Sequence, residues 1–237
     1  MTYKPTRSEI SRENKRNADE LEADLVKECD LLRNLGLADV EKIPDPVKIT
    51  QKYKDGSIKG RVLARSTVDF GGTIKGGLAV HFDAKVTTDD SRWNFSCLDS
   101  KDTKGRKGRT QREFLADNAR LGAASFVFLR HKPFMGHVRH YMLPVDKDGV
   151  VAGITHRKSL SFTNGDAGPF LVKRNQTWFD KLKELMLREA RHAVEVARVA
   201  PEESSGSHDV IGGSPASPGE LIEAVNASRI VRKPAQG

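Results

Sequence analysis

Two features are scarce or absent in this sequence of 237 residues, and each absence excludes a class of protein. The only cysteines, Cys29 and Cys97, stand far apart and match no metal-ligand spacing. This use of cysteine argues against a disulfide framework and predicts a reducing intracellular compartment. We find no run of 18 apolar residues and no secretory pattern, so we expect a soluble, cytoplasmic protein without a membrane segment.

What the chain has in surplus is positive charge. Its net charge is +8 and its isoelectric point is near 9.5, which favours a polyanionic partner. We expect nucleic acid rather than a membrane surface, because no basic amphipathic helix is evident. Residues 201–237 contain three basic and five acidic residues, a net of −2, so residues 1–200 carry about +10. The basic charge therefore lies on the part of the chain that we expect to fold.

The most informative stretch is residues 66–87, which predicts two antiparallel strands. From Leu78 to Thr87 apolar and polar residues alternate, as in a half-buried strand, so Asp83 and Lys85 share one face. Residues 66–72 form the first strand, and the glycines at 71, 72, 76 and 77 supply the turn. A turn centred near residue 76 places Asp69 opposite Asp83, because 69 and 83 sum to 152, which is twice 76.

These two carboxylates predict a metal site. Opposed Cβ atoms on one sheet face lie about 4.5–5.5 Å apart, and two carboxylates that close repel each other unless a proton or a cation intervenes. Mg²⁺ is a suitable bridge because it binds few carboxylates and keeps several waters. With Lys85 to position the nucleophile, Asp69 and Asp83 predict a metal-dependent nuclease. The alternative is a salt bridge between Asp83 and Lys85 on a solvated sheet face.

A second hairpin is predicted around Asp55-Gly56, a strong turn signal between alternating segments. A turn at these two residues places Lys52 opposite Lys59. Like charges directly opposite each other destabilise a hairpin, so we expect this one to bind a phosphate backbone. The alternative is a solvated, lysine-rich edge that resists aggregation. The basic residues of this hairpin that we assign to DNA binding are Lys48, Lys52, Lys54, Lys59, Arg61 and Arg65.

A glycine-punctuated basic run follows, between residues 101 and 112. It lacks the Gly-x-x-x-x-Gly-Lys-Ser/Thr pattern, which excludes a P-loop. A loop that contacts phosphates and a merely solvated run of charges are both open alternatives. The DNA-binding candidates in this run are Lys104, Arg106, Lys107, Arg109 and Arg112.

The spacing of apolar residues predicts the remaining elements. The expected helices are 8–35, 110–121 and 175–199, and the expected strands are 124–131 and 137–143. Ser, Gly and Pro dominate from Pro201 to Gly219 and predict a flexible tail, with a short helix near residues 220–230. We therefore expect a nuclease domain over residues 1–200 and a tail over residues 201–237.

The run from Ser66 to Thr87, with Phe82-Asp83-Ala84-Lys85 in its second strand, resembles the RecU-type Holliday junction resolvases of the PD-(D/E)xK nuclease superfamily. The resemblance covers roughly residues 14–145, and aspartate stands at position 83 where that family usually has glutamate. Further matches are the runs Leu21–Leu25 and Lys42–Val47, the pair Asn94-Phe95, and Gln111.

This resemblance implies an α/β fold with a restriction-endonuclease-like core, in which helices flank a mixed central β-sheet and a β-hairpin projects. By position, it implies that Asp69 and Asp83 bind Mg²⁺ or Mn²⁺ and that Lys85 is the catalytic lysine. It also implies that Glu22 is a helix-borne acidic member of the site and that Gln111 lies at its edge. The implied protein is a bacterial or phage-encoded enzyme that acts in the cytoplasm.

The implied activity is resolution of four-way DNA junctions by paired symmetric nicks. Because such a junction is two-fold symmetric, the two cuts require two copies of the site, and a C2 homodimer follows. Two alternatives stay open from the residues alone. One is a related PD-(D/E)xK endonuclease that acts on duplex, flap or single-stranded DNA. The other is a nucleic-acid-binding protein without a catalytic role.

Overall fold

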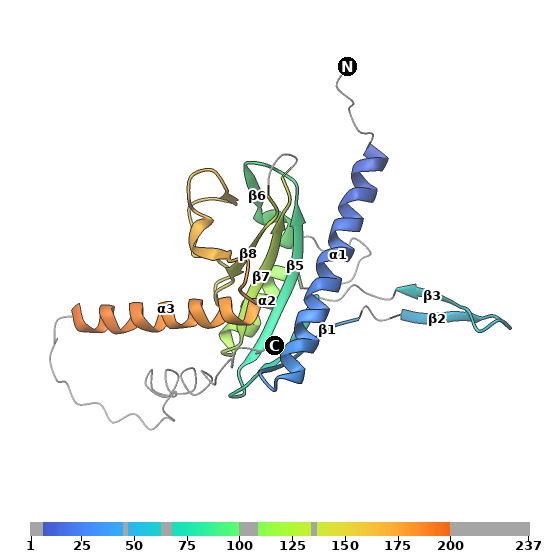
Figure 1. Cartoon of the computed structure of the whole chain (residues 1–237), viewed down its shortest axis with the longest axis horizontal. Coiled ribbons are helices and arrows are strands. Elements are labelled where there is room, and N and C mark those ends of the chain that lie inside the picture. Colours follow the sequence, from blue (N-terminus) through green and yellow to red (C-terminus); the bar gives the residue numbers. More distant parts are fainter. Residues whose placement is uncertain (1–6, 45–46, 63–67, 100–108, 134–136, 200–237) are drawn as a thin grey trace, which may run out of the picture. The chain divides into compact units, whose positions relative to one another are not determined.

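The computed structural model describes residues 7–44, 47–62, 68–99, 109–133 and 137–199 (Figure 1). The chain divides into two compact units, Met1–Arg174 and Asn175–Gly237, which we describe separately. No helix in the part of the chain that the structure describes combines the length and the apolar character that a membrane crossing requires.

A six-stranded sheet forms the centre of the first unit. In sheet order its strands are β1 (Ala38–Lys42), β4 (Phe70–Ile74), β5 (Ala79–Thr87), β7 (Ala124–His131), β8 (Arg139–Pro144) and β10 (Leu171–Val172). The pair β5–β7 is parallel and the other pairs are antiparallel, so the sheet is mixed. This confirms the predicted α/β class with a mixed central sheet.

Helices cover both faces of this sheet (Figure 1). Helix α1 (Arg7–Asn34) buries Leu21, Leu25 and Leu32 and ends where Gly36 adopts a positive φ of 64°. On the other face lies α2 (Gln111–Arg120), which begins with a capping box between Thr110 and Glu113. Both helices were predicted, and each boundary lies within a residue of its expected place.

The central strands are held by aromatic stacking on the face that α1 covers. The ring centroids of Phe70 and Phe82 lie 4.7 Å apart, and those of Phe82 and Phe126 also lie 4.7 Å apart. Arg130 follows on the same face of β7 and donates to Asp24 of α1 at 2.5 Å. Because successive strand residues alternate between faces, Asp83 must project to the opposite face, toward α2.

The β4–β5 hairpin has the predicted register but not all of the predicted turn. Phe70 pairs with Phe82 and Gly71 with His81, and both pairs sum to 152. Gly76 and Gly77 form the turn with φ of 100° and 84°. The expectation that Gly71 and Gly72 also belong to the turn is wrong, because both lie within β4.

Gly72 has a different role, which is to let β1 approach. A Cβ atom at this position would lie 2.0 Å from the carbonyl oxygen of Asp39 in β1. Only glycine fits so close to a neighbouring backbone. This close approach places the end of β1, with Lys42, directly beside the start of β4.

Strands β2 (Val47–Lys52) and β3 (Ile58–Val62) form a separate two-stranded sheet. The predicted pairing of Lys52 with Lys59 is wrong, because Lys59 pairs with Gln51 and Lys52 with Ile58. Five residues rather than four separate the strands, and the loop is closed by the Tyr53 amide, which donates to the Ser57 carbonyl at 2.8 Å.

A like-charge pair is nevertheless present in this hairpin. Beyond a register shift between Ile49 and Gln51, Lys48 pairs with Arg61. Between residues 50 and 60, every residue whose exposure is described is exposed. The hairpin therefore contributes no described side chain to a core.

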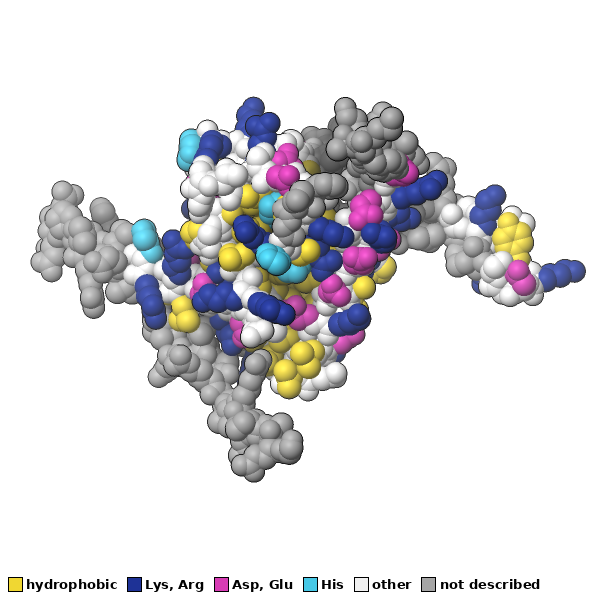
Figure 2. Space-filling model, turned by 45° about the horizontal axis from the view of Figure 1, so that its top comes forward, with side chains coloured by type: hydrophobic (Ala, Val, Ile, Leu, Met, Phe, Trp, Pro, Cys, Tyr) yellow, Lys and Arg dark blue, Asp and Glu magenta, His cyan; other side chains and the backbone are white. Residues whose placement is uncertain are grey.

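Charges of both signs mix on the surface of the molecule. Figure 2 shows Lys and Arg side chains scattered among Asp and Glu side chains, rather than gathered in a single basic block on that face. Several of these charges are paired, as in the contacts of Arg33 with Asp30 at 3.1 Å and with Asp39 at 2.7 Å. Exposed pairs of this kind contribute little to stability.

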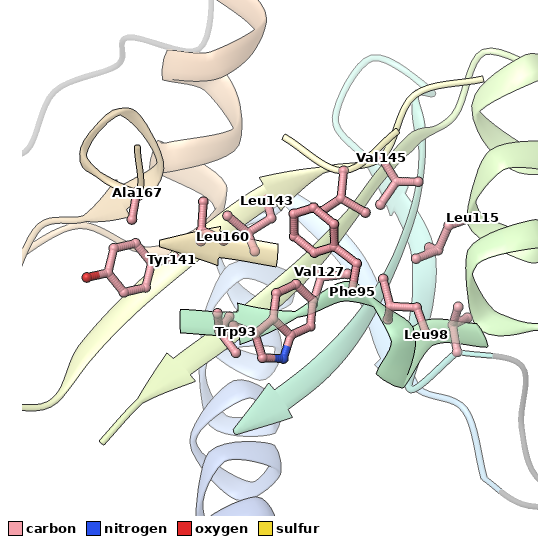
Figure 3. Close-up of a cluster of buried hydrophobic side chains, with 13 residues drawn as sticks. Trp93, Phe95, Leu98, Leu115, Val127, Tyr141, Leu143, Val145, Leu160 and Ala167 are labelled. Carbon is pink, nitrogen blue, oxygen red and sulfur yellow. The ribbon is translucent and has the colours of Figure 1, made fainter. Parts of the chain in front are cut away.

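A cluster of buried apolar side chains lies on the face of the sheet that α2 covers (Figure 3). It combines Leu115 of α2 and Val127 of β7 with Trp93 and Leu160, which come from a small sheet of β6 (Arg92–Asn94) and β9 (Ser159–Ser161). Two 3₁₀ turns, η1 (Phe95–Asp99) and η2 (Gly168–Phe170), border this cluster. The sequence analysis did not predict β1, β6, β9, β10 or the two 3₁₀ turns.

The second unit contains α3 (Trp178–Val199), which confirms the predicted C-terminal helix. The buried residues of its first turns, Trp178, Phe179, Leu182 and Leu185, recur at helical spacing. The predicted tail over residues 201–237 and its short helix lie outside the described residues.

Candidate active site

Asp83 is the centre of the candidate site, and it is fully buried in the middle of the sheet. Its strand β5 pairs with β7 at this position, where Asp83 lies opposite Val127, and with β4 as far as Phe82. Gln111, the first residue of α2, donates from Nε2 to Asp83 Oδ1 at 2.8 Å. Lys85 Nζ lies 2.5 Å from Asp83 Oδ2. These two contacts join three of the five predicted site residues.

Burial changes the acidity of this pair. It raises the pKa of Asp83 to about 8, an effect that the Lys85 ammonium opposes and that Asp69 increases. Burial works to lower the pKa of Lys85, but the Asp83 carboxylate more than offsets it, so that pKa is raised. The site therefore retains a proton on Asp83 readily unless a second cation stabilises the carboxylate.

Asp69 lies one residue before β4, at the position that the hairpin register places opposite Asp83. The ladder between β4 and β5 has ended here, and the Asp69 side chain replaces it by accepting a hydrogen bond from the Ala84 amide at 2.9 Å. This bond fixes Asp69 close enough to Asp83 to raise the pKa of Asp83. The two carboxylates thus lie near each other, and their predicted role as metal ligands stays a prediction.

Glu22 stands apart from these two aspartates. It lies on α1, and its carboxylate accepts a hydrogen bond from Lys42 at the end of β1. This bond is the main cause of the raised pKa of Lys42, to which Asp69 also contributes. Glu22 is therefore linked to the aspartates through the Lys42 ammonium. Within the described residues, no three His, Cys, Asp or Glu side chains are close enough to hold one metal ion.

Lys42 is a site residue that the sequence analysis did not assign. Its position depends on the pairing of β1 with β4, and β1 is too short for its alternation to predict a strand. Cys97 of η1 is a second neighbour of the site. Burial of its thiol raises the pKa of Cys97 to about 11, although the residue as a whole is exposed. The nearby Lys85 ammonium opposes that rise.

The predicted DNA-binding residues differ in their surroundings. Lys52, Lys54 and Lys59 are exposed on the β2–β3 hairpin, and no ion pair joins them to another described residue. Arg109 is also exposed but donates to Asp117 at 2.8 Å. Arg112 is partly buried and bound to Asp99. For Lys48 and Arg61 only the strand position is described, and Arg65, Lys104, Arg106 and Lys107 lie outside the described residues.

A mixed sheet flanked by helices, with a hairpin that carries two aspartates and an Asp-x-Lys sequence, defines a nuclease of the restriction-endonuclease-like class. A family model described as "RecU: Recombination protein U" matches residues 17–164. The chain therefore belongs to the RecU family of Holliday junction resolvases and is a structure-selective nuclease of recombination. A comparison with curated proteins gave no match.

Proposed function

We propose that this protein is a metal-dependent endodeoxyribonuclease that resolves four-way junctions by paired nicks at the site around Asp83. The observation that carries the proposal is a buried carboxylate with a raised pKa, held between Gln111 on one oxygen and Lys85 on the other. A buried charge is costly even when it is paired, and titratable groups with strongly shifted pKa values cluster at functional sites. Membership in a nuclease family argues against the alternative of a non-catalytic DNA-binding protein.

The donor atoms of the site suit Mg²⁺ or Mn²⁺. Asp69 and Asp83 supply hard carboxylate oxygens, and Asp83 Oδ2 is buried without a well-formed hydrogen bond. When bound between these residues, the ion would supply Lewis-acid activation of the scissile phosphate and of the attacking water. Two protein carboxylates are few, as is usual for Mg²⁺, which keeps several of its waters.

The other residues of the site would position the two carboxylates and balance their negative charge. Lys85 would orient the nucleophile and offset negative charge that develops on the phosphate oxygens. Gln111 fixes the Asp83 carboxylate through Oδ1, so an ion would bind at Oδ2, beside the Lys85 ammonium that lies 2.5 Å from that oxygen. Glu22 and Lys42 form an ion pair next to Asp69 and would set the local charge.

We further propose that the active form is a C2 homodimer in the cytoplasm. A four-way junction has two-fold symmetry, and paired cuts on strands of like polarity require two sites related by that axis. The exposed lysines of the β2–β3 hairpin would contribute backbone contacts that do not depend on sequence.

The test is a comparison of substrates and ions in one set of reactions. Purified protein is incubated with a four-way junction, a flap and a plain duplex of matched sequence, in Mg²⁺, Mn²⁺, Ca²⁺ or EDTA. We expect paired nicks near the branch point of the junction in Mg²⁺ or Mn²⁺ only. Equal cleavage of the duplex would contradict junction selectivity, and full cleavage in EDTA would contradict metal dependence.

A further inference from the structure

We propose that Arg112 is a positioning residue that acts through Gln111, and that it does so by pairing with Asp99. We call this pair the Arg112–Asp99 clamp. The inference rests on the proposed function, because it assigns a role to a residue next to the site around Asp83. It differs from the prediction that Arg112 contacts a DNA phosphate.

The clamp is a two-pronged ion pair. Arg112 donates from Nε to Asp99 Oδ1 at 2.7 Å and from Nη2 to Asp99 Oδ2 at 2.9 Å. Nη2 also donates to the carbonyl oxygen of Phe95 at 2.9 Å. Parallel bonds between a guanidinium and a carboxylate are strong and have a fixed direction. These bonds engage three of the five N–H donors of the guanidinium and leave the two on Nη1 for any phosphate contact.

Packing on a third segment holds the Arg112 stem. A Cβ atom at Gly149 would lie 3.4 Å from Arg112 Cγ and Cδ, so the turn from Asp146 to Gly149 packs against the aliphatic part of the side chain. Asp146 Oδ1 braces this turn by accepting hydrogen bonds from the amides of Asp148 at 2.8 Å and Val150 at 2.9 Å. Only 26% of the Arg112 side chain is exposed, compared with 61% for Arg109.

The clamp joins the two segments that flank the site. Arg112 is adjacent to Gln111, which holds Asp83, in the first turn of α2. Asp99 ends η1, whose Phe95 and Leu98 are buried in the apolar cluster and whose Cys97 lies near Lys85. Because buried side chains of η1 anchor it in the core, the clamp also restrains the start of α2, where Gln111 lies. A misplacement of about 1 Å in a catalytic arrangement can cost roughly 100-fold in rate.

The two interpretations of Arg112 predict opposite effects for Asp99. A phosphate-binding arginine would be freed when Asp99 loses its charge, so Asp99→Asn would strengthen DNA binding or leave cleavage unchanged. If Arg112 acts through the clamp, loss of either partner breaks the ion pair. Asp99→Asn would then impair cleavage in the same way as Arg112→Gln. The change at the acidic partner therefore distinguishes the two roles.

The experiment measures single-turnover nicking of a four-way junction at saturating protein, together with junction affinity over a salt series. We expect Arg112→Gln and Asp99→Asn each to lower the rate about 10- to 100-fold, with affinity and its salt dependence unchanged. The double variant should be no slower than either single variant, because the two residues act as a unit. Arg112→Lys keeps the charge but loses the fork and should fall between wild type and Arg112→Gln.

Gln111 provides the readout that separates positioning from general stability. In a Gln111→Ala background, Arg112→Gln should lower the rate no further, because its effect passes through Gln111. The matched control is Arg120→Gln, which removes an exposed arginine from the last turn of the same helix and should leave the rate unchanged. The midpoint of thermal unfolding identifies any variant that fails to fold. If Arg112→Gln fails to fold, the nicking rate of Arg112→Lys is measured in its place.

Two results would overturn the clamp. One is a normal rate for Asp99→Asn; the other is an Arg112→Gln variant whose only defects are weaker binding and a salt slope lower by about one. Failure of the proposed function would differ from both, because Asp83→Asn would then still cut the junction.

Discussion

The two hairpins with glycine turns, β4–β5 and β2–β3, differ in how far their side chains are buried. The β4–β5 hairpin lies within the six-stranded sheet, and its residues 80, 82 and 83 are buried. Among the strands that the structure describes, β2 and β3 pair with each other alone, and their described side chains between residues 50 and 60 are exposed. One hairpin fixes two carboxylates, and the other displays lysines to water.

This difference shows where each kind of chemistry can be placed. Exclusion of water is the main cause of the raised pKa of Asp83, so this shift depends on the sheet and α2 around the residue. A lysine that contacts phosphates gains affinity by releasing counterions, which requires an accessible charge rather than a rigid one. We therefore expect changes in the first hairpin to affect the rate of cleavage and changes in the second to affect affinity.

The largest effect is expected for Lys85→Met, which should lower the single-turnover rate about 100- to 1,000-fold while junction affinity stays near wild type. The physical reason is that Lys85 lies 2.5 Å from Asp83, where it can offset charge on the reacting phosphate. Lys59→Met, in the exposed hairpin, is the control and should retain the rate. A Lys85→Met rate within threefold of wild type would remove this lysine from the catalytic group.

The second prediction concerns pH. Because the pKa of Asp83 is raised to about 8, Mg²⁺ must displace a proton below that pH, and its affinity should rise up to tenfold per pH unit until about pH 8. Without metal, the unfolded state ionises first, near pH 4, so the free energy of unfolding should fall as pH rises from about 4 to about 8. Titration calorimetry with Mg²⁺ and thermal melts without it measure the two trends. An Mg²⁺ affinity that does not change between pH 6 and pH 8 would argue against a protonated Asp83.

The third prediction concerns the exposed hairpin. Changing Lys52 and Lys59 together to alanine should weaken junction binding roughly tenfold and lower the salt slope by about two, since each phosphate contact contributes about 0.9. The rate at saturating protein should not change. Binding that stays the same across a salt series would instead favour the solvated-edge interpretation of this hairpin.

The smallest effect is expected at Lys42. Removing its charge by Lys42→Met leaves Glu22 unpaired next to Asp69, so the site becomes more negative and should bind Mn²⁺ about threefold more tightly. Adding Glu22→Gln to that variant should restore the wild-type affinity. Mn²⁺ binding followed by electron paramagnetic resonance measures this, and weaker binding by Lys42→Met would show that Lys42 positions the carboxylates rather than reducing their charge.

The sequence was sufficient to predict the central hairpin because two local signals agree there. Alternation placed Asp83 and Lys85 on one face, and the glycine turn placed Asp69 opposite Asp83, as the register confirms. The β2–β3 register was one residue off beside the loop, which has five residues, and two residues off beyond the ladder shift near Thr50. A turn signal predicts that a hairpin exists more reliably than it predicts its register.

What the sequence could not supply are pairings between distant segments. Lys42 meets Glu22 across 20 residues and Arg112 meets Asp99 across 13, and neither spacing is periodic. In sequence, Arg112 is one member of a basic run, equivalent to Arg109. Only the packing of α2 against η1 distinguishes the two arginines.

The central claim is that Asp83 serves cleavage and not binding. The direct test is Asp83→Asn, measured for nicking in Mg²⁺ and for junction affinity in Ca²⁺ on the same labelled four-way junction, with a thermal melt to verify folding. We predict nicking below about one thousandth of the wild-type rate and an affinity within about threefold of wild type. Nicking at the wild-type rate by the folded variant would contradict the claim.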